Sequence, residues 1–101
     1  MVDKFLNFLV YEKRVSQNTI LAYEKDLDQF FAFIQTHYHL NSEQDVIHVH
    51  LRAWAVSLIE TQLNPVSVNR KIACLKSYFK FLRSRGFIVN NPASRIRPLK
   101  T

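Results

Sequence analysis

The sequence predicts an all-α protein, a compact orthogonal bundle of four helices with an extended C-terminal tail. Two observations support this prediction. Apolar residues recur every three or four positions through most of the chain, which is the period of a buried helix face. One glycine and three prolines in 101 residues are too few for the closely spaced turns of an all-β fold.

The first two helices are predicted over residues 2–13 and from Ser16 to about Thr36. Ser16 is a good N-cap, because its hydroxyl can accept a hydrogen bond from the first turn. The apolar residues of the first helix are Phe5, Leu6, Phe8, Leu9 and Tyr11. The expected core stripe of the second helix consists of Ile20, Tyr23, Leu27, Phe30, Phe31 and Ile34.

A loop over residues 38–44 separates these helices from the third, which begins at Asp45 or His48 and ends near Gln62. No single residue in this stretch marks the start of the third helix, so both positions remain open. The residues expected to face the core are Leu51, Trp54, Ala55, Leu58 and Ile59.

The fourth helix has clear signals at both ends. Asn64 is an N-cap, and Pro65 suits the first helical position, where an N–H group has no partner in the helix. We expect the helix to run to Arg85 and to stop at Gly86 in the C′ position. Its core stripe is Val68, Ile72, Leu75, Phe79 and Leu82.

We therefore expect a folded domain over residues 1–86 and an extended tail over residues 87–101. The tail contains Asn91-Pro92 and Arg97-Pro98, and proline disfavours a helical conformation in the residue before it. The composition of the tail is that of a linker, so we expect the chain to be part of a longer protein.

Several classes of protein and site are disfavoured by composition. A single cysteine, Cys74, cannot form an internal disulfide, and no apolar run approaches the ~18 residues of a membrane span. We expect a cytoplasmic protein with no membrane partner. No metal or other cofactor is expected, because no cysteine or carboxylate accompanies the histidines at zinc-site spacing and one glycine cannot build a phosphate-binding loop. The four histidines are His37, His39, His48 and His50.

The formal net charge of +6 is unevenly distributed along the chain. Residues 1–64 carry more acidic than basic side chains, whereas residues 65–101 contain no aspartate or glutamate. The nine basic residues of this acid-free segment are Arg70, Lys71, Lys76, Lys80, Arg83, Arg85, Arg95, Arg97 and Lys100. Such a one-sided charge favours a polyanionic partner such as nucleic acid, and a solubilising surface is the alternative.

The fourth helix directs much of this charge away from its core stripe. At ~100° per residue, its outward arc consists of Asn69, Arg70, Ala73, Lys76, Ser77, Lys80 and Ser84. A solvated helix face ordinarily mixes glutamate with lysine, and this arc has no acid. Its cations can reach phosphates or base edges, and its small residues let a partner approach closely. We therefore expect this face to contact DNA or RNA.

The second helix has a weaker version of the same pattern. Its outward arc consists of Asn18, Ala22, Lys25, Gln29 and Ala32, beside an N-terminal turn whose N–H groups could hold a phosphate. Asp26 and Asp28 flank this arc. They must either lie away from the contact or pair with a neighbouring cation.

Three stretches resemble one protein family in order and spacing. Residues 16–34 (SQNTILAYEKDLDQFFAFI) resemble S-x-x-T-x-x-x-Y-x-x-D-L-x-x-F-x-x-F, and residues 50–60 (HLRAWAVSLIE) resemble I-R-x-F-x-x-x-L. Residues 63–100 resemble L-S-x-x-S-x-x-R-x-x-x-x-L-R-x-F-[FY]-x-[FY]-L followed by a glycine, Asn-Pro-Ala and a terminal Pro-Lys type sequence. This is the pattern of the N-terminal, core-binding domain of tyrosine recombinases, and it most resembles the Xer recombinases and related integrases.

The resemblance implies a SAM-like four-helix domain that forms half of a clamp around double-stranded DNA. The second and fourth helices would face the major groove, the catalytic domain of the same protein would close from the other side, and four protomers would assemble on DNA. The DNA-binding residues implied by position are Asn18, Thr19, Ala22, Tyr23, Lys25, Ser67, Asn69, Arg70, Lys71, Lys76 and Lys80. Lys71 and Tyr23 lie nearer the apolar side of their helices than the others do.

The resemblance places the chemistry, attack by a tyrosine on a DNA phosphate, in a separate C-terminal domain. None of the tyrosines here matches the motif of that nucleophile, so we expect no catalytic residue and no activity from this chain alone. Two alternatives remain open: a stand-alone helical DNA-binding protein and a protein-interaction bundle. Exposed apolar residues on the first or third helix favour protein interaction, and an uninterrupted basic face on the fourth favours DNA.

Overall fold

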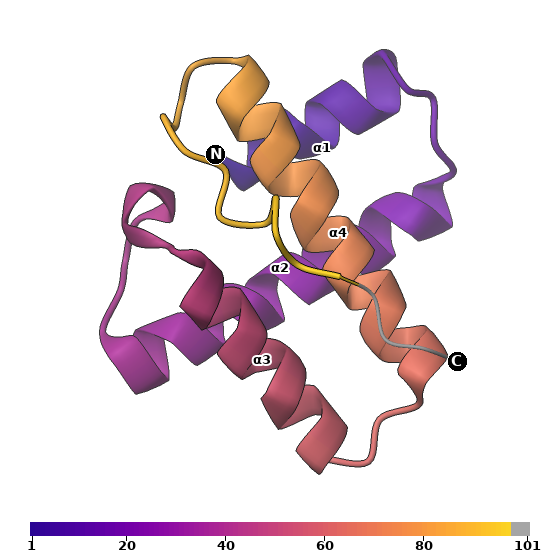
Figure 1. The fold of residues 1–101 in the computed structure, drawn as a ribbon. Coiled ribbons are helices and arrows are strands. Elements are labelled where there is room, and N and C mark those ends of the chain that lie inside the picture. Colours follow the sequence, from indigo (N-terminus) through magenta and orange to yellow (C-terminus); the bar gives the residue numbers. More distant parts are fainter. Residues whose placement is uncertain (98–101) are drawn as a thin grey trace.

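The computed structural model describes residues 1–97 and confirms the predicted four-helix fold (Figure 1). The four helices are α1 (Val2–Tyr11), α2 (Gln17–Tyr38), α3 (His48–Glu60) and α4 (Pro65–Ser84), and a short 3₁₀ helix, Glu43–Asp45, precedes α3. The described part of the chain contains no strand. Pro98 and Lys100, part of the motif at the end of the sequence, lie outside the described residues.

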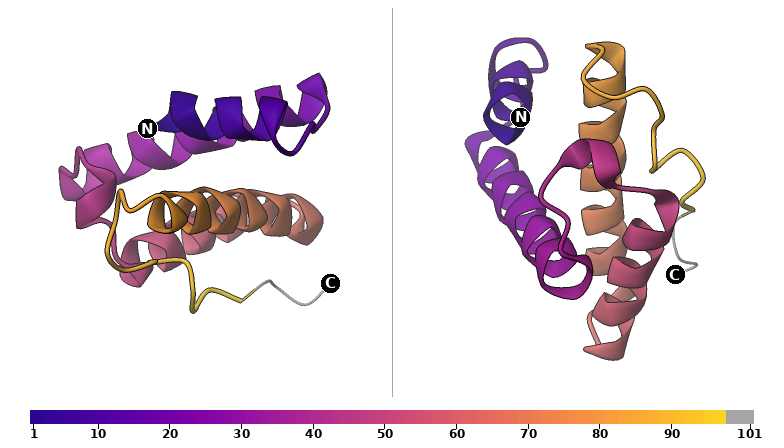
Figure 2. Two further views of the ribbon diagram at one scale, coloured as in Figure 1. Left: turned by 90° about the horizontal axis from the view of Figure 1, so that it is seen from above. Right: turned by 90° about the vertical axis from the view of Figure 1, so that its left-hand side faces the viewer.

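The helices form two layers, which Figure 2 shows most clearly. Helices α1 and α2 lie in one layer and α3 and α4 in the other, and α4 crosses in front of α2 in Figure 1. Residues 87–97 run along the side of α4 that faces away from α1. The crossing of α2 and α4 brings their two predicted outward arcs near each other.

Aromatic side chains join the two layers. Phe5 of α1 meets the edge of Tyr78 of α4 with ring centroids 5.3 Å apart. Phe30 of α2 packs edge-on against Trp54 of α3 at 5.4 Å and against Phe79 of α4 at 6.2 Å. Such edge-to-face pairs add stabilisation beyond the burial of their area. One aromatic cluster thus links all four helices.

Hydrogen bonds between residues close in sequence mark the starts of α2, α3 and α4. The Ser16 hydroxyl accepts from the Thr19 N–H at 3.2 Å, and Asn64 Oδ1 accepts from the Val66 N–H at 2.7 Å, so both predicted N-caps are confirmed. Helix α3 begins after Ile47, which has no side-chain acceptor, and the Ile47 N–H donates instead to His50 Nδ1 at 3.0 Å. This unusual cap explains why the sequence alone did not distinguish between the two possible starts.

All four helices are followed by a residue with positive φ. These residues are Arg14 (φ 52°), His39 (57°), Gln62 (62°) and Gly86 (78°), so glycine occupies the predicted stop position after α4. After each of them, the next N–H donates to a carbonyl five or six residues earlier, as from Phe87 to Leu82 at 2.9 Å. The residues that follow, Val15, Leu40, Leu63 and Phe87, pack their apolar side chains against the core.

The predicted core stripes are confirmed, with the exception of Ile59. All five stripe residues of α4 are buried, and those of α2 are buried or half-buried. Ile59 is 45% exposed, so the prediction that it faces the core is wrong, and Tyr11 of the first helix is 76% exposed. At ~100° per residue they lie roughly 120–140° around their helices from the buried Trp54 and Phe5. Helix α1 also ends at Tyr11, two residues before its predicted end.

The segment after α4 is not helical, but it is anchored to the core. Ile88, Ala93 and Ile96 are buried, and the Gln44 side chain donates to the Phe87 carbonyl at 3.4 Å. The Ala93 N–H donates to Asn91 Oδ1 at 2.8 Å, which forms a local turn. The packed core therefore continues beyond residue 86, where the predicted domain boundary was placed.

A candidate nucleic-acid interface

The basic arc of α4 faces outward as predicted, although its members differ in exposure. Lys80 is exposed and Lys76 is half-buried, and neither has an ion-pair partner among residues 1–97. The Arg70 side chain is 51% exposed, and its Nη2 lies 3.4 Å from Asp26 Oδ1. Arg70 is thus partly paired, whereas the two lysines are available to an anionic partner.

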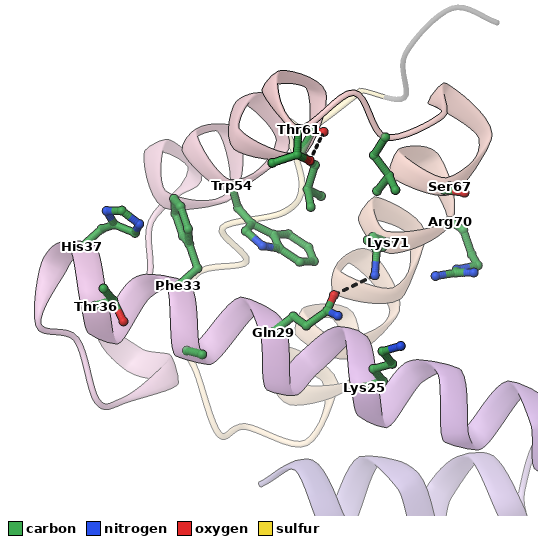
Figure 3. Close-up of a pocket in the computed structure, with 13 residues that line it drawn as sticks. Lys25, Gln29, Phe33, Thr36, His37, Trp54, Thr61, Ser67, Arg70 and Lys71 are labelled. Atoms are coloured by element: carbon green, nitrogen blue, oxygen red, sulfur yellow. Dashed lines mark hydrogen bonds between the residues drawn. The ribbon is translucent and has the colours of Figure 1, made fainter.

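A groove between α2, α3 and α4 adjoins this arc (Figure 3). It has a volume of about 640 Å³, and no acidic side chain lines it. Lys25 of α2 and Arg70 of α4 stand at one end, and Trp54 and Phe33 line the groove further along (Figure 3). The groove therefore combines an apolar wall with a basic end.

Four of the predicted binding residues meet at this groove: Lys25, Ser67, Arg70 and Lys71. The other members of the predicted set lie elsewhere on α2 and α4. Lys76 and Lys80 are further along α4, and Asn69 of the same helix is half-buried. Ala22 is half-buried in the first half of α2. The structure thus gathers four members of the predicted set at the groove and leaves the others elsewhere along α2 and α4.

The N-terminal turn of α2 is partly occupied by its own cap. Ser16 Oγ accepts from the Thr19 N–H at 3.2 Å and lies 2.9 Å from Thr19 Oγ1. Asn18 is exposed beside this pair. The cap already uses the N–H group and the hydroxyl of Thr19. A phosphate at this turn would therefore be bound by Asn18 and the remaining N–H groups.

Tyr23 lies mostly on the apolar side, as its position on the helix suggested. Its ring stacks on Phe5 at a centroid distance of 6.3 Å, and its carbonyl accepts from Cys74 Sγ at 3.8 Å. Burial raises the pKa of Tyr23, so its hydroxyl keeps its proton at neutral pH. Because the Tyr23 side chain is half-buried, a partner could contact only the exposed part of its ring.

Lys71 lies in the interior, so the structure gives it a different setting from an exposed phosphate ligand. It is 7% exposed, and its ammonium donates to Asp26 Oδ1 at 2.6 Å and to Gln29 Oε1 at 2.8 Å. Asp26 is 1% exposed. The expectation that an acid flanking the α2 arc pairs with a neighbouring cation is confirmed for Asp26.

Three further reactive side chains, those of Tyr78, Cys74 and His50, take part in the packing and hydrogen bonds of the fold. Tyr78 is buried and its hydroxyl donates to Glu43 Oε1 at 2.8 Å, and burial raises the pKa of Tyr78. Burial also raises the pKa of the Cys74 thiol to about 12, so the reactive thiolate form is scarce. Burial lowers the pKa of His50, whose Nδ1 accepts the helix-cap hydrogen bond.

In the described part of the chain, no cluster of three or more histidine, cysteine or acidic side chains is arranged to hold a metal ion. Within residues 1–97, none of the helices is both long and apolar enough to cross a membrane.

Sequence reasoning missed the apolar wall of the groove. Phe33, Trp54 and Leu58 line it together with the amide of Gln29. Trp54 and Leu58 were assigned to the core from their spacing, and that spacing cannot show that one edge of a packed residue also borders a groove. Gln29 was noted on the outward arc but was not included among the binding residues.

Comparison with known proteins identifies the domain type. The family model described as phage integrase, N-terminal SAM-like domain, matches residues 2–86. A tyrosine recombinase XerC of Roseiflexus castenholzii is 38% identical over 95 residues, which cover 94% of this chain and 30% of that protein. A tyrosine recombinase XerD of Rickettsia conorii is 34% identical over 95 residues, again covering 94% and 30%.

A second XerC, from Oceanobacillus iheyensis, is 33% identical over 100 residues, covering 99% of this chain and 32% of that protein. The chain thus spans about a third of the length of the curated relatives it matches. No solved structure matches it significantly. The family match covers all four helices and the relatives align along nearly the whole chain, so the chain belongs to the phage integrase N-terminal SAM-like domain family.

Proposed function

We propose that this chain is the DNA-binding domain of a site-specific tyrosine recombinase and that it grips duplex DNA with α2 and α4. The observation that carries the proposal is the acid-free basic surface formed by the outward arc of α4 and the adjoining groove. The names of the relatives, tyrosine recombinases XerC and XerD, support recombination as the activity of the parent protein.

Each part of this surface suits a different contact with DNA. Lys76 and Lys80 have no acidic partner among the described residues and can neutralise phosphates. The planar guanidinium of Arg70 can bind a phosphate or a guanine edge through two hydrogen bonds. Ala73 and Ser77 have small side chains and lie on the arc among these cations, so the DNA backbone can approach α4 closely.

The wider assembly belongs to the same proposal. The domain would form half of a clamp that a catalytic domain of the same protein completes, with four protomers assembling on DNA. Strand cleavage would reside in that other domain, because none of the tyrosines in this sequence matches the motif of the recombinase nucleophile. The proposal also places the protein in the cytoplasm, as expected for a relative of the tyrosine recombinases XerC and XerD.

The salt dependence of DNA binding tests the proposal directly. We expect weak binding to duplex DNA with little sequence preference, and a slope of log K against log salt near −4 to −5 for about four to six neutralised phosphates. The double variant Lys76→Ala/Lys80→Ala should make this slope less negative by about 2, because each lost phosphate contact removes about 0.9. Electrophoretic mobility shifts at several salt concentrations provide the measurement.

Arg52 offers a matched control, because it is an exposed cation on α3, away from the basic arc. Arg52→Ala should leave both affinity and slope unchanged. A slope near zero for the unaltered chain would overturn the proposal. The assignment to α4 would fail if Arg52→Ala weakened binding as much as the double variant does.

A second candidate function is protein–protein contact, because α3 presents an apolar stripe to solvent. Val49, Val56 and Ile59 are each 45–46% exposed and lie on one side of α3, with the exposed Arg52 between Val49 and Val56, and α1 exposes Val10 and Tyr11. Exposed apolar surface of this kind is typical of contact surfaces between protomers. This candidate is compatible with DNA binding, since the α3 stripe is separate from the α4 arc.

Self-association of the chain tests this second candidate. We expect the average mass in sedimentation equilibrium to rise with protein concentration and Val56→Glu to abolish the rise, because a charge opposes burial of the stripe. DNA binding at low protein concentration should be unaffected by Val56→Glu. A monomer at every concentration would show that the stripe does not join copies of this chain.

A further inference from the structure

Two cations meet one buried carboxylate oxygen where α2 and α4 cross. Asp26 Oδ1 accepts a hydrogen bond from Lys71 Nζ at 2.6 Å and lies 3.4 Å from Arg70 Nη2. The Asp26 side chain is 1% exposed and that of Lys71 is 8% exposed, whereas that of Arg70 is 51% exposed. One cation is therefore enclosed with the carboxylate and the other remains half in solvent.

The two contacts differ in strength. A separation of 2.6 Å is a short, charge-assisted hydrogen bond, and 3.4 Å lies beyond the usual range for N–H···O bonds. Lys71 is held further by Gln29 Oε1 at 2.8 Å (Figure 3). The Asp26 charge is thus satisfied chiefly by Lys71, and Arg70 contributes only a weak contact.

The second oxygen of the Asp26 carboxylate indicates how Arg70 would bind if Lys71 were absent. Asp26 Oδ2 is buried and has no hydrogen-bond partner among the described residues. A buried carboxylate strongly attracts any cation within reach, because its charge is costly to leave unpaired. Without Lys71, Arg70 would be the nearest cation, and its guanidinium could bind both oxygens in the bidentate mode that arginine favours.

We propose that Lys71 is a positioning residue for DNA binding: it holds the Asp26 carboxylate and so leaves the Arg70 guanidinium available to a phosphate at the groove. The proposal rests on the proposed function above. Lys71 acts through Arg70 and does not itself touch DNA. The three side chains together carry one net positive charge, and this arrangement presents that charge at Arg70, the most exposed of the three.

A double-mutant cycle on the full chain separates this role from a direct DNA contact. We expect Arg70→Ala to weaken duplex binding at low salt by roughly tenfold, the loss of one good charged contact. In a Lys71→Gln background the same substitution should change affinity less than twofold, because Asp26 then already holds Arg70. Equal losses in both backgrounds would overturn the proposal.

The variant Asp26→Asn/Lys71→Gln distinguishes electrostatics from packing. It removes the carboxylate charge as well as the ammonium, so Arg70 should be released and the tenfold effect of Arg70→Ala should return. If that effect stays small, the loss in the Lys71→Gln background came from altered packing and the proposal fails. Circular dichroism establishes that each variant retains its helices, and Lys71→Met serves as a second neutral substitution if Lys71→Gln does not fold.

Proton exchange at the Arg70 guanidinium, followed by NMR, tests the capture step without DNA. Exchange should be slower in Lys71→Gln than in the unaltered chain and should become fast again in Asp26→Asn/Lys71→Gln. If the unaltered chain does not bind DNA but exchange slows as expected, the proposed function fails while the capture of Arg70 stands. If DNA binds with the expected salt slope but exchange does not change, the positioning role alone is wrong.

Discussion

Asp26→Leu is expected to destabilise the protein by about 3–5 kcal/mol, because it leaves the Lys71 ammonium buried without its counterion. Lys71 would keep only the Gln29 carbonyl oxygen as a close partner, at 2.8 Å. The weak contact of Arg70 with the same carboxylate would be lost as well. Urea unfolding followed by far-ultraviolet circular dichroism measures the change in the free energy of unfolding.

The double variant Asp26→Leu/Lys71→Met is the matched control. A buried ion pair replaced by apolar residues of similar size is often neutral or stabilising, so most of the loss should be recovered. Recovery would show that the single substitution acts through the unpaired charge. A single variant as stable as the unaltered chain would mean that Lys71 can reach water, contrary to its enclosed position.

Phe79→Ala should cost about 3–5 kcal/mol of unfolding free energy, the range for removing a buried aromatic side chain. Phe79 is fully buried, with its ring 6.2 Å from that of Phe30 and 5.2 Å from that of Tyr78. The substitution therefore removes an aromatic contact between α4 and α2 and leaves a cavity. Calorimetric melting of the variant and the unaltered chain gives the difference.

The neighbouring residue on α4 provides the contrast. Lys80 is exposed and has no ion-pair partner among residues 1–97, so Lys80→Ala should change stability by no more than about 0.5 kcal/mol. Its effect should appear in DNA affinity instead. Should Lys80→Ala unfold the protein and Phe79→Ala leave it intact, the assignment of core and outward faces on α4 would be wrong.

Much of α4 could be predicted from sequence because its signals are local. Asn64, Pro65 and Gly86 mark its ends through hydrogen bonds and dihedral angles that involve only near neighbours. Its apolar residues keep a regular helical spacing, so the buried face followed from geometry alone. The other helices are followed by positive φ at Arg14, His39 and Gln62, residues that rarely adopt it, and the ends of these helices were therefore less certain.

The candidate site was only partly predictable, because its key contact joins residues far apart in the chain. Lys71 and Asp26 are 45 positions apart, and a helical wheel gives the direction of a side chain but not what lies opposite it. The groove could not be predicted for the same reason, because it is formed by residues of three helices, α2, α3 and α4. The burial of Ile88, Ala93 and Ile96 follows no helical or strand period, so sequence spacing did not reveal it.

The position of Trp54 gives the molecule an optical reporter of its own. It is the one tryptophan in the chain, it is 3% exposed and packed edge-on against Phe30, and it also lines the groove. An indole in an apolar setting emits at shorter wavelengths than one in water, so unfolding shifts the emission to the red. A partner that enters the groove changes the surroundings of the same ring without unfolding it. A single intrinsic signal, recorded with no added dye, thus distinguishes loss of the core from occupation of the groove.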